Sequence, residues 1–344
     1  MSHRGFVCLA VVLLTLIQWQ GLRVLLGASL SHRENRTPNV AVQSGADDEQ
    51  ATAAGSLCGQ ATARYREGSE SSTSAVLASY PGSGNTWLRL NLEQTSQVLT
   101  GSIYTDKFKA LDFAGEGQVD RVVIVKSHAP WHGQLGAHLA RLPLAPTQGV
   151  VHLVRHPFAA IASYWNWIEE TTVRDSASLA RERRQRLSWI EVAAETTVEM
   201  VRGQPGAASA TTPQQRWTAW RDAHFGLEAR GWLAHSVYFV RRSVSAPVLA
   251  VRYEDLSLDA PATLRSVLAF LRSVGTLAPR PAQEDERMIA CSLAHQERTR
   301  IHRAHREWRP GFTDYQRAVI WNITNSAPYR LGDFFGYTHD GGHY

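Results

Sequence analysis

The sequence predicts an α/β fold in which helices cover both faces of a mainly parallel β-sheet. Short apolar runs of strand length alternate along the chain with longer segments of helical periodicity, an alternation that is typical of parallel sheets. The first apolar run ends in the breaker sequence Pro81-Gly82-Ser83-Gly84, directly before a helical segment. Ligands of such sheets bind at the carboxyl ends of the strands, so functional side chains are expected just after the apolar runs.

Four apolar runs have the length and aliphatic composition of strands that are buried on both faces. They are residues 75–80, 122–126, 149–155 and 248–253. The segments between and after them include stretches of helical character. These are residues 86–99, 157–170, 178–203, 214–233 and 260–274. Pro157 opens the second helical stretch, in the first turn, where proline is favoured.

The composition fits a folded protein and excludes wholesale disorder. Of the 344 residues, 44% are hydrophobic, which is enough for a substantial buried core. The formal net charge of +5 fits an anionic ligand, a nucleic acid or a membrane surface, and does not choose among them. Arginines cluster within residues 181–186 and 298–309, as they do on solvated helix faces and around anionic ligands.

The N-terminal region predicts a membrane anchor followed by a stem. The apolar run 5–22 has roughly 18 residues, near the lower limit for spanning a bilayer. We expect residues 1–4 to be a cytosolic tail and 5–22 a signal anchor. A signal peptide cleaved near residues 27–29 is the alternative. Residues 23–73, rich in small and acidic residues, predict a lumenal stem, and 74–338 the folded domain.

Either kind of leader would place the folded domain in the secretory pathway. Asn35 and Asn322 begin glycosylation sequons there. The oxidising lumen would also allow Cys58 and Cys291 to form a disulfide, while Cys8 lies in the apolar N-terminus. No pair among the three cysteines has metal-ligand spacing, so we expect no metal site.

The turn after the first strand has the composition of a phosphate-binding loop. Gly82 and Gly84 allow backbone N–H groups to approach an anion closely, and Ser83, Asn85 and Thr86 add side-chain donors. The following helix contributes a favourable dipole and unpaired N–H groups. A plain turn capped by Asn85 or Thr86 is the structural alternative. No lysine follows the glycines, which argues against a kinase or nucleotide triphosphatase.

Lys126 and His128 stand at the end of the second predicted strand. Because they are two residues apart, strand alternation places both side chains on one side. Histidine is suited to take a proton from a hydroxyl, and lysine is suited to stabilise developing negative charge. A histidine that merely hydrogen-bonds a carbonyl group at a strand end is the alternative.

Arg155 ends the third predicted strand, and Ser163 follows inside the next helix. An arginine offers a permanently charged, bidentate contact to phosphate, and a serine adds a compact hydroxyl donor. The alternatives are a surface ion pair for Arg155 and a helix-packing role for Ser163. Tyr253 follows the fourth predicted strand, in the run Tyr-Glu-Asp-Leu.

These segments, in this order, resemble the sulfotransferases that use 3′-phosphoadenosine 5′-phosphosulfate (PAPS). Residues 80–87 resemble the family's 5′-phosphosulfate loop, Y-P-K-S-G-T-T-W, and residues 126–130 resemble its K-T-H-x-P motif. Residues 155–163 resemble the 3′-phosphate motif R-[ND]-P-x-[DE]-x-x-x-S, with the same spacing from Arg to Ser. The form P-G-S-G-N-T-W, with residues 100–104 downstream, is closer to the catalytic region of the WSC-domain-containing sialate O-sulfotransferases, without their WSC domain.

The resemblance implies a P-loop-like sulfotransferase fold and a role for each motif. His128 would be the catalytic base, and Lys126 would stabilise the transition state. The residues implied to bind PAPS are Gly82, Ser83, Gly84, Asn85 and Thr86 at the 5′-phosphosulfate, Trp87 and Tyr253 at the adenine, and Arg155 and Ser163 at the 3′-phosphate. A lumenal sulfotransferase of this kind usually acts on glycans or on protein tyrosine, and the nearest relatives imply a hydroxyl of a sialylated glycan as the acceptor. Together with the N-terminal anchor, we expect a type II protein of the Golgi membrane with a lumenal catalytic domain and no nucleic-acid partner.

Several positions depart from the family pattern. Gly82 replaces a lysine that contacts the leaving group in many members, and Arg89 is the candidate to supply the missing charge. His156 and Ala159 also differ from the commoner residues of the 3′-phosphate motif. The C-terminal R-K-G-x-x-G motif has no match, and residues 303–311 are the nearest segment.

Aromatic residues provide candidates for acceptor binding. Tyr164, Trp165 and Trp167 lie in one predicted helix, and Trp217 and Trp220 recur three residues apart in another. Aromatic planes suit stacking on sugars, but the helical spacing of Trp217 and Trp220 favours the core. Residues 181–186 would suit an acidic acceptor. The rival hypotheses are a glycan-binding or scaffolding protein that keeps the sulfotransferase fold and has lost the chemistry, motivated by Gly82, and a nucleotide kinase.

Overall fold

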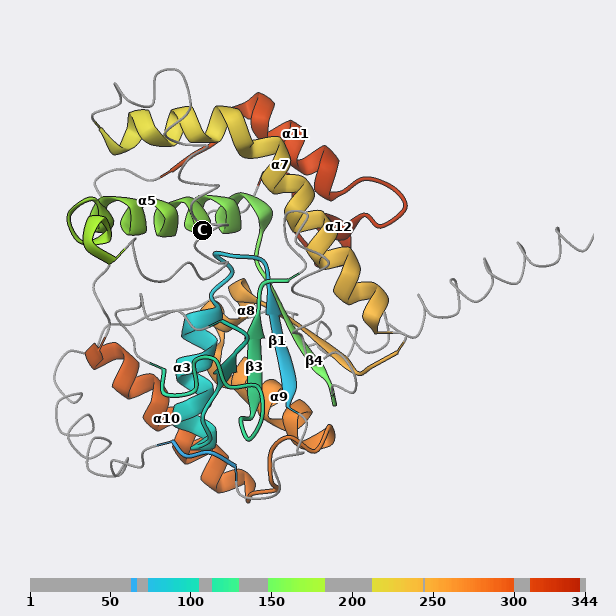
Figure 1. Ribbon diagram of the computed structural model, residues 1–344. Helices are drawn as coiled ribbons and strands as arrows, with labels where there is room; N and C mark the ends of the chain where they lie inside the picture. Colours follow the sequence, from blue (N-terminus) through green and yellow to red (C-terminus); the bar gives the residue numbers. More distant parts are fainter. Residues whose placement is uncertain are drawn as a thin grey trace, which may run out of the picture. The chain divides into compact units, whose positions relative to one another are not determined.

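The computed structural model describes residues 63–66, 74–104, 113–129, 148–182, 212–243, 245–299 and 310–340, which Figure 1 draws as coloured ribbon. Within these ranges five strands form one sheet in the order β2-β3-β1-β4-β5, and every neighbouring pair is parallel. The strands are β1 (Ala75–Ser79), β2 (Gly101–Ser102), β3 (Ile124–Ser127), β4 (Val150–Val154) and β5 (Val248–Arg252). The predicted parallel α/β architecture is confirmed.

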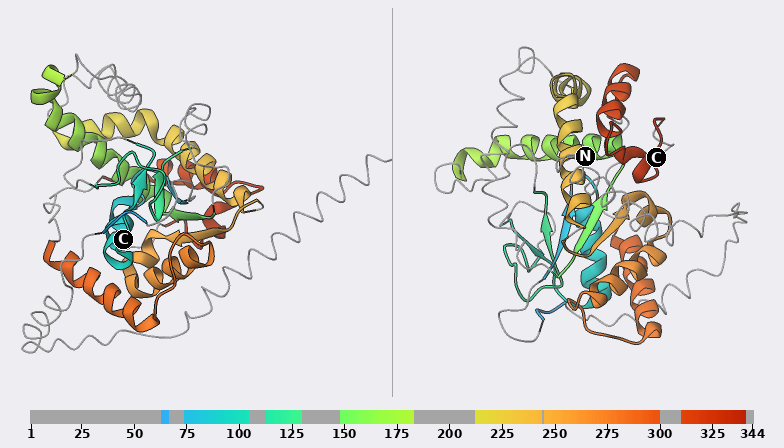
Figure 2. Two further views of the ribbon diagram at one scale, coloured as in Figure 1. Left: turned by 60° about the horizontal axis from the view of Figure 1, so that its bottom comes forward. Right: turned by 90° about the vertical axis from the view of Figure 1, so that its right-hand side faces the viewer.

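Helices lie on both faces of the sheet, as the sequence predicts. They are α3 (Asn85–Ser96), α5 (Pro157–Glu182), α7 (Pro213–Arg242), α8 (Tyr253–Leu258), α9 (Ala260–Ser273), α10 (Ala282–Thr299), α11 (Asp314–Thr324) and α12 (Leu331–Phe334). Helices α3 and α9 cover one face, and α10 packs against both of them. Helix α7 covers β4 and β5 from the opposite face, and α11 packs on α7 (Figures 1 and 2).

The alternation of side chains along β1 builds both hydrophobic layers. Ala75 and Leu77 face one cluster, which includes Leu88 of α3 and Leu268 of α9. Val76 and Ala78 belong to the other, which includes Phe239 of α7. All five residues of β1 are buried, because successive side chains of a central strand point to opposite, covered faces.

The four predicted strands are present with small shifts at their ends, and two elements differ from the prediction. Strand β2 has only two residues, too short to produce any hydrophobic pattern. Helix α5 continues past residue 170, where a helix end was expected, and α7 continues to Arg242. No Gly or Pro interrupts either extension, and tertiary packing readily overrides weak local propensity.

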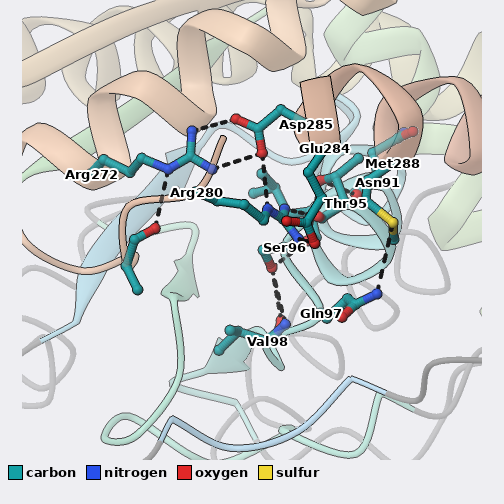
Figure 3. Close-up of polar contacts among 12 residues, drawn as sticks. Asn91, Thr95, Ser96, Gln97, Val98, Arg272, Arg280, Glu284, Asp285 and Met288 are labelled. Carbon is teal, nitrogen blue, oxygen red and sulfur yellow. Dashed lines mark hydrogen bonds and ion pairs between the residues drawn. The ribbon is translucent and has the colours of Figure 1, made fainter. Parts of the chain in front are cut away.

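A polar clamp joins the helices on the α3 face of the sheet (Figure 3). Arg272 of α9 and Arg280 both bind the carboxylate of Asp285 in α10, with N···O distances of 2.8 Å and 3.1 Å. Burial opposes the charge of Asp285, but the two arginines outweigh it and hold the pKa of the carboxyl below its ordinary value. Arg280 also donates to the carbonyl oxygen of Thr95, so the clamp fixes the end of α3.

The indole pair of α7 belongs to the core, as its helical spacing predicts. Trp217 and Trp220 are each 1% exposed, and their rings stack with centroids 5.7 Å apart. Trp165 of α5, also 1% exposed, packs on both rings. These three indoles therefore join α5 to α7 and are inaccessible to an acceptor.

Several predictions fall outside the described residues. They concern the tail, anchor and stem in residues 1–73 apart from 63–66, Asn35, the C-terminal segment 300–309, and the side chains of residues 181–186. None of the helices in the described part of the chain is long and apolar enough to cross a membrane. Cys291 in α10 is disulfide-bonded; Cys8 and Cys58 lie outside the described ranges, so its pairing with Cys58 stays a prediction.

Candidate active site

The predicted site residues follow the carboxyl ends of β1, β3, β4 and β5 and meet at one edge of the sheet. Helix α5 leaves β4 and runs over this edge, above the end of β1 (Figures 1 and 2). The turn between β1 and α3 touches α5 directly at Gly82. Because all the strands are parallel, segments remote in sequence are brought to this edge together.

Both glycines of the loop are required by close contacts. Gly82 has φ +80°, and a Cβ atom there would lie 2.3 Å from the carbonyl oxygen of Ala160 in α5. Gly84 has φ +96°, and a Cβ atom there would lie 2.4 Å from the ring of Tyr253. A side chain at position 82 would collide with the backbone of α5. The packing of α5 on the loop thus accounts for glycine where many sulfotransferases have lysine.

The loop presents unused hydrogen-bonding groups at the start of α3. The N-cap residue, Gly84, has no side chain to cap the first turn of α3. The backbone N–H groups of that turn can therefore bind an anion. The Ser83 hydroxyl is buried, with the residue 1% exposed. Neither the Ser83 hydroxyl nor Asn85 Oδ1 has a hydrogen-bond partner within the described residues. Buried polar groups are rarely left unsatisfied, so these atoms indicate a ligand at the loop.

His128 lies beside this loop, and its tautomer follows from its contacts. Its Nδ1 atom is 2.8 Å from the main-chain oxygen of Ser79 and 3.3 Å from the Ser79 hydroxyl. A carbonyl oxygen only accepts hydrogen bonds, so Nδ1 carries the hydrogen and donates it. The neutral ring then has its lone pair on Nε2, which is the protonation state that a general base requires.

Ser79 connects His128 to the turn between β1 and α3. Its hydroxyl accepts a hydrogen bond of 3.0 Å from the Asn85 amide, at the first turn of α3. Its main-chain oxygen accepts from His128. The turn between β1 and α3 and the ring of His128 are therefore both held by one residue at the end of β1.

Tyr104 is a site residue to which the sequence analysis gave no role. Its hydroxyl accepts a 2.8 Å hydrogen bond from the backbone N–H of His128, and the two rings stack with centroids 5.7 Å apart. The Lys126 ammonium lies 5.3 Å from the centre of the Tyr104 ring, within cation–π range. Tyr104 thus contacts both predicted catalytic residues. Its place depends on β2 pairing with β3, which no local pattern reveals.

The predicted 3′-phosphate and adenine residues converge on the same loop. Arg155 donates a 2.9 Å hydrogen bond to the main-chain oxygen of Gly82, and its guanidinium lies 4.1 Å from the centre of the Tyr253 ring. Trp87 meets Tyr253 edge-on, with centroids 5.7 Å apart. The backbone of Ser163 lies 3.2 Å from the Cβ position of Gly82. All of these residues surround the loop, and Thr86 is half-buried at the start of α3.

Arg89 does not supply the charge that Gly82 lacks, and the expectation that it would is wrong. The residue is 1% exposed. Its guanidinium donates to the Thr100 hydroxyl at 2.8 Å and forms an ion pair of 2.6 Å with Glu116. The ring of Phe113 lies 3.8 Å away on its face. These contacts fix Arg89 as a structural residue that secures β2 to α3.

His156, a departure from the family pattern, has a structural role that the sequence did not indicate. Its backbone N–H donates to Glu254, 2.8 Å away, and the Tyr337 hydroxyl donates to the other oxygen of that carboxylate. Its Nε2 atom lies 3.0 Å from the main-chain oxygen of Thr338. Burial, opposed by that carbonyl, lowers the pKa of His156 to about 4. The ring therefore stays neutral and ties the C-terminal segment to the start of α5.

A second buried contact attaches the loop to α7. The Tyr80 hydroxyl donates a 2.5 Å hydrogen bond to Glu228. Burial and the neighbouring carboxylate of Glu228 raise the pKa of Tyr80 well above its ordinary value, so the phenol remains protonated and keeps donating.

Within the described ranges, no group of acidic, histidine or cysteine side chains could hold a metal ion.

Comparison with known proteins identifies partial relatives. No family model matches the sequence. A WSCD family member of Drosophila pseudoobscura pseudoobscura is 42% identical over 93 residues, which are 26% of this chain and 27% of that protein. A WSCD family member of Aedes aegypti is 27% identical over 228 residues, 64% of this chain and 55% of that protein. The chain thus spans between about a quarter and just over half of the length of these relatives.

Among solved structures, the chain is similar to mouse sulfotransferase SULT7A1 complexed with PAP. The superposition has a TM-score of 0.42 and 14% sequence identity. It covers 81% of this chain and 91% of the mouse protein.

Proposed function

We propose that the protein is a PAPS-dependent sulfotransferase that acts on a hydroxyl group of a glycan, with sialylated glycans as the favoured class. The observation that carries the proposal is the position of Ser79, which accepts hydrogen bonds from both Asn85 and His128. An anion-binding turn and a general base therefore adjoin, as transfer of an anionic group to a hydroxyl requires. The likeness to WSCD family members over 64% of the chain agrees with the resemblance seen in the motifs.

The residues fit a sulfonated nucleotide. The Ser83 hydroxyl and the uncapped N–H groups of α3 offer donors to the 5′-phosphosulfate. Arg155 and Ser163 lie on the α5 side of the same loop and would bind the 3′-phosphate. Tyr253 already packs on Arg155 and Trp87, which makes it and Trp87 the aromatic wall for the adenine.

The donor supplies a sulfonyl group on a phosphate leaving group, and this chain supplies the acid–base and electrostatic help. A bond forms between sulfur and the acceptor oxygen, and the bond between sulfur and the phosphate oxygen breaks. His128 Nε2 takes the acceptor proton, and the electron pair leaves with the phosphate. Lys126, only 4% exposed beside Tyr104, stabilises the negative charge where screening by water is weak.

The proposal includes a Golgi-lumenal catalytic domain behind a type II membrane anchor. Its support is the apolar run 5–22 and the disulfide at Cys291, since disulfides persist in oxidising compartments. The exposed Asn322 of the second sequon agrees with this location.

A second candidate is a PAP-binding protein that has lost the chemistry. The contact of Gly82 with α5 favours it, because that contact leaves no room for the family's loop lysine. The two candidates share the nucleotide site and differ in whether His128 and Lys126 perform transfer.

Binding of 3′-phosphoadenosine 5′-phosphate (PAP) tests the nucleotide site without any acceptor. We expect PAP at 100 times its Kd to raise the free energy of unfolding of the full chain by about 2.7 kcal/mol, and ATP to have a much smaller effect. Arg155→Ala should weaken PAP binding by roughly 10- to 100-fold, because it removes a charged hydrogen-bond donor. Thermal unfolding and calorimetry measure both quantities.

Arg265→Ala is the matched control, because Arg265 lies on α9 in an exposed ion pair with Glu286. The PAP affinity of this variant should equal that of the wild type. A wild-type chain that is stabilised by ATP but not by PAP would contradict the proposal and favour a kinase. A folded chain that responds to neither nucleotide would contradict both candidates.

A further inference from the structure

Trp167 is more exposed than four other indoles of the described chain. The residue is 40% exposed, whereas Trp165, Trp217, Trp220 and Trp232 are each at most 1% exposed. Leaving so large an apolar side chain in water forgoes a substantial part of the hydrophobic stabilisation that its burial would bring. Since the same helix buries Trp165 two residues earlier, the exposure of Trp167 is a particular feature of this position.

The exposed indole lies next to the phosphate loop. Trp167 stacks on Tyr164, with centroids 6.0 Å apart and an interplanar angle of 16°. The backbone nitrogen of Tyr164 lies 2.7 Å from the Cβ position of Gly82. Ser163, the predicted 3′-phosphate residue, is four residues before Trp167 and thus on the same face of α5. Helix α5 runs over the carboxyl edge of the sheet (Figures 1 and 2). Tyr164 therefore connects the indole of Trp167 to the loop.

The support beneath the indole is rigid. Tyr164 is 2% exposed and meets the rings of Tyr80 and Trp220 edge-on, both with centroids 6.3 Å away. Tyr80 is in turn hydrogen-bonded to Glu228. An aromatic ring stacked on a fixed base offers its face to a ligand at little cost in side-chain entropy.

The surroundings of the indole favour an amphipathic ligand over an apolar one. Ser163 and Asn166 are polar and half-buried beside it, and the described part of α5 shows no second large apolar side chain that is exposed. A pyranose ring has an apolar face of C–H groups and an edge of hydroxyls, so it can pack on the indole while a hydroxyl hydrogen-bonds to Asn166. A purely apolar ligand would find only one large exposed apolar side chain, Trp167, on the described part of α5.

We propose that Trp167 is the platform on which a sugar ring of the acceptor stacks. The proposal rests on the proposed function, because it uses the sulfonyl-transfer site as the neighbouring centre. Trp167 would then set acceptor affinity and preference for a carbohydrate. It would have no part in binding the nucleotide or in proton transfer.

Kinetics with a defined glycan test this role. With sialyl-N-acetyllactosamine as acceptor and saturating PAPS, Trp167→Ala should raise the acceptor KM about 10-fold, which corresponds to ~1.4 kcal/mol. The kcat and the Kd for PAP should stay near their wild-type values, because the chemistry and the nucleotide site are untouched. Trp167→Phe keeps an aromatic face and should retain most of the affinity.

Tyr315→Ala is the control, because Tyr315 is a 73% exposed aromatic residue on α11. The acceptor KM of this variant should equal that of the wild type. An unchanged acceptor KM in Trp167→Ala would overturn the proposal. A large loss of PAP affinity in that variant would overturn it too, since the residue would then belong to the nucleotide site.

A binding measurement separates this proposal from the proposed function. Indole fluorescence of the PAP-bound wild-type chain should change on titration with the same glycan, and the change should be lost in Trp167→Phe. Wild-type protein that binds PAP and the glycan but transfers nothing would refute sulfonyl transfer and still support the platform. Transfer by the wild type, with the fluorescence response intact in Trp167→Phe, would refute the platform alone. No response of the wild type to the glycan would overturn the platform whatever the activity.

Discussion

His128→Ala is expected to lower the rate of sulfonyl transfer by roughly 10²–10⁴-fold, the usual contribution of a general base. The hydrogen bond from Nδ1 to Ser79 fixes the tautomer with its lone pair on Nε2, and alanine has no atom that can take the acceptor proton. The donor site is left intact, because none of the predicted nucleotide-binding atoms belongs to His128. The Kd for PAP should therefore stay within a few-fold of the wild-type value.

Transfer of labelled sulfonyl and calorimetry with PAP measure the two effects separately. His339→Ala is the control, since His339 is exposed near the C-terminal end of the described chain, and its transfer rate should match the wild type. Wild-type rates in His128→Ala would show that another group takes the proton. Loss of PAP binding in parallel with activity would show that the histidine supports the loop instead.

Acidification from pH 7 to pH 5 is expected to lower the free energy of unfolding by about 4 kcal/mol through the two buried histidines His152 and His156, or ~2 kcal/mol for each, and to lower it further through His235. Burial lowers the pKa of His152 to about 3 and, opposed in part by the Thr338 carbonyl, that of His156 to about 4. Burial, with His152 and His128 nearby, also lowers the pKa of His235 well below its ordinary value. The ring centroids of His152 in β4 and His235 in α7 lie 5.5 Å apart.

The sign follows from the difference between the folded and unfolded states. Above pH 6.5 these histidines are mostly neutral in both states, so their contribution to stability is fully present. Below pH 6.5 the unfolded chain binds protons that the folded chain does not accept. Stability is then lost progressively until the pH reaches the lowered pKa values of the folded state.

Chemical denaturation at a series of pH values measures this loss. His235→Leu removes one of the three groups and should reduce the loss of stability between pH 7 and pH 5. His339→Ala again serves as the control for replacing a histidine, here at an exposed position. A wild-type stability that is flat from pH 7 to pH 5 would contradict the buried, neutral state of these rings.

Much of the fold could be predicted because the strands are short apolar runs bounded by breakers. Residues 75–79 follow this pattern, and all of them are buried in the centre of the sheet. Strand β2 could not be predicted, since its two residues are defined by pairing with β3 rather than by composition. The length of α5 was also missed, because local sequence alone does not determine where a helix of weak propensity ends.

The site could be predicted where chemistry and spacing occur in one segment. Lys126 lies near the end of β3 and His128 directly follows that strand, while Arg155 directly follows β4. Tyr104 could not be assigned a role, because its contact with His128 requires β2, β3 and the loop after β3 to be placed together. Arg89 was misassigned for the same reason, since its partner Glu116 lies on a segment whose position the sequence does not reveal.

The most direct test of the central claim is to incubate the full wild-type chain with PAPS that carries a ³⁵S-labelled sulfonyl group, together with sialylated glycans. We predict that the label appears on a glycan hydroxyl, that an equal amount of PAP is formed, and that neither occurs without protein. Formation of no PAP above background, by protein that binds PAP normally, would contradict the claim. The protein would then be one that kept the nucleotide site and lost the transfer chemistry.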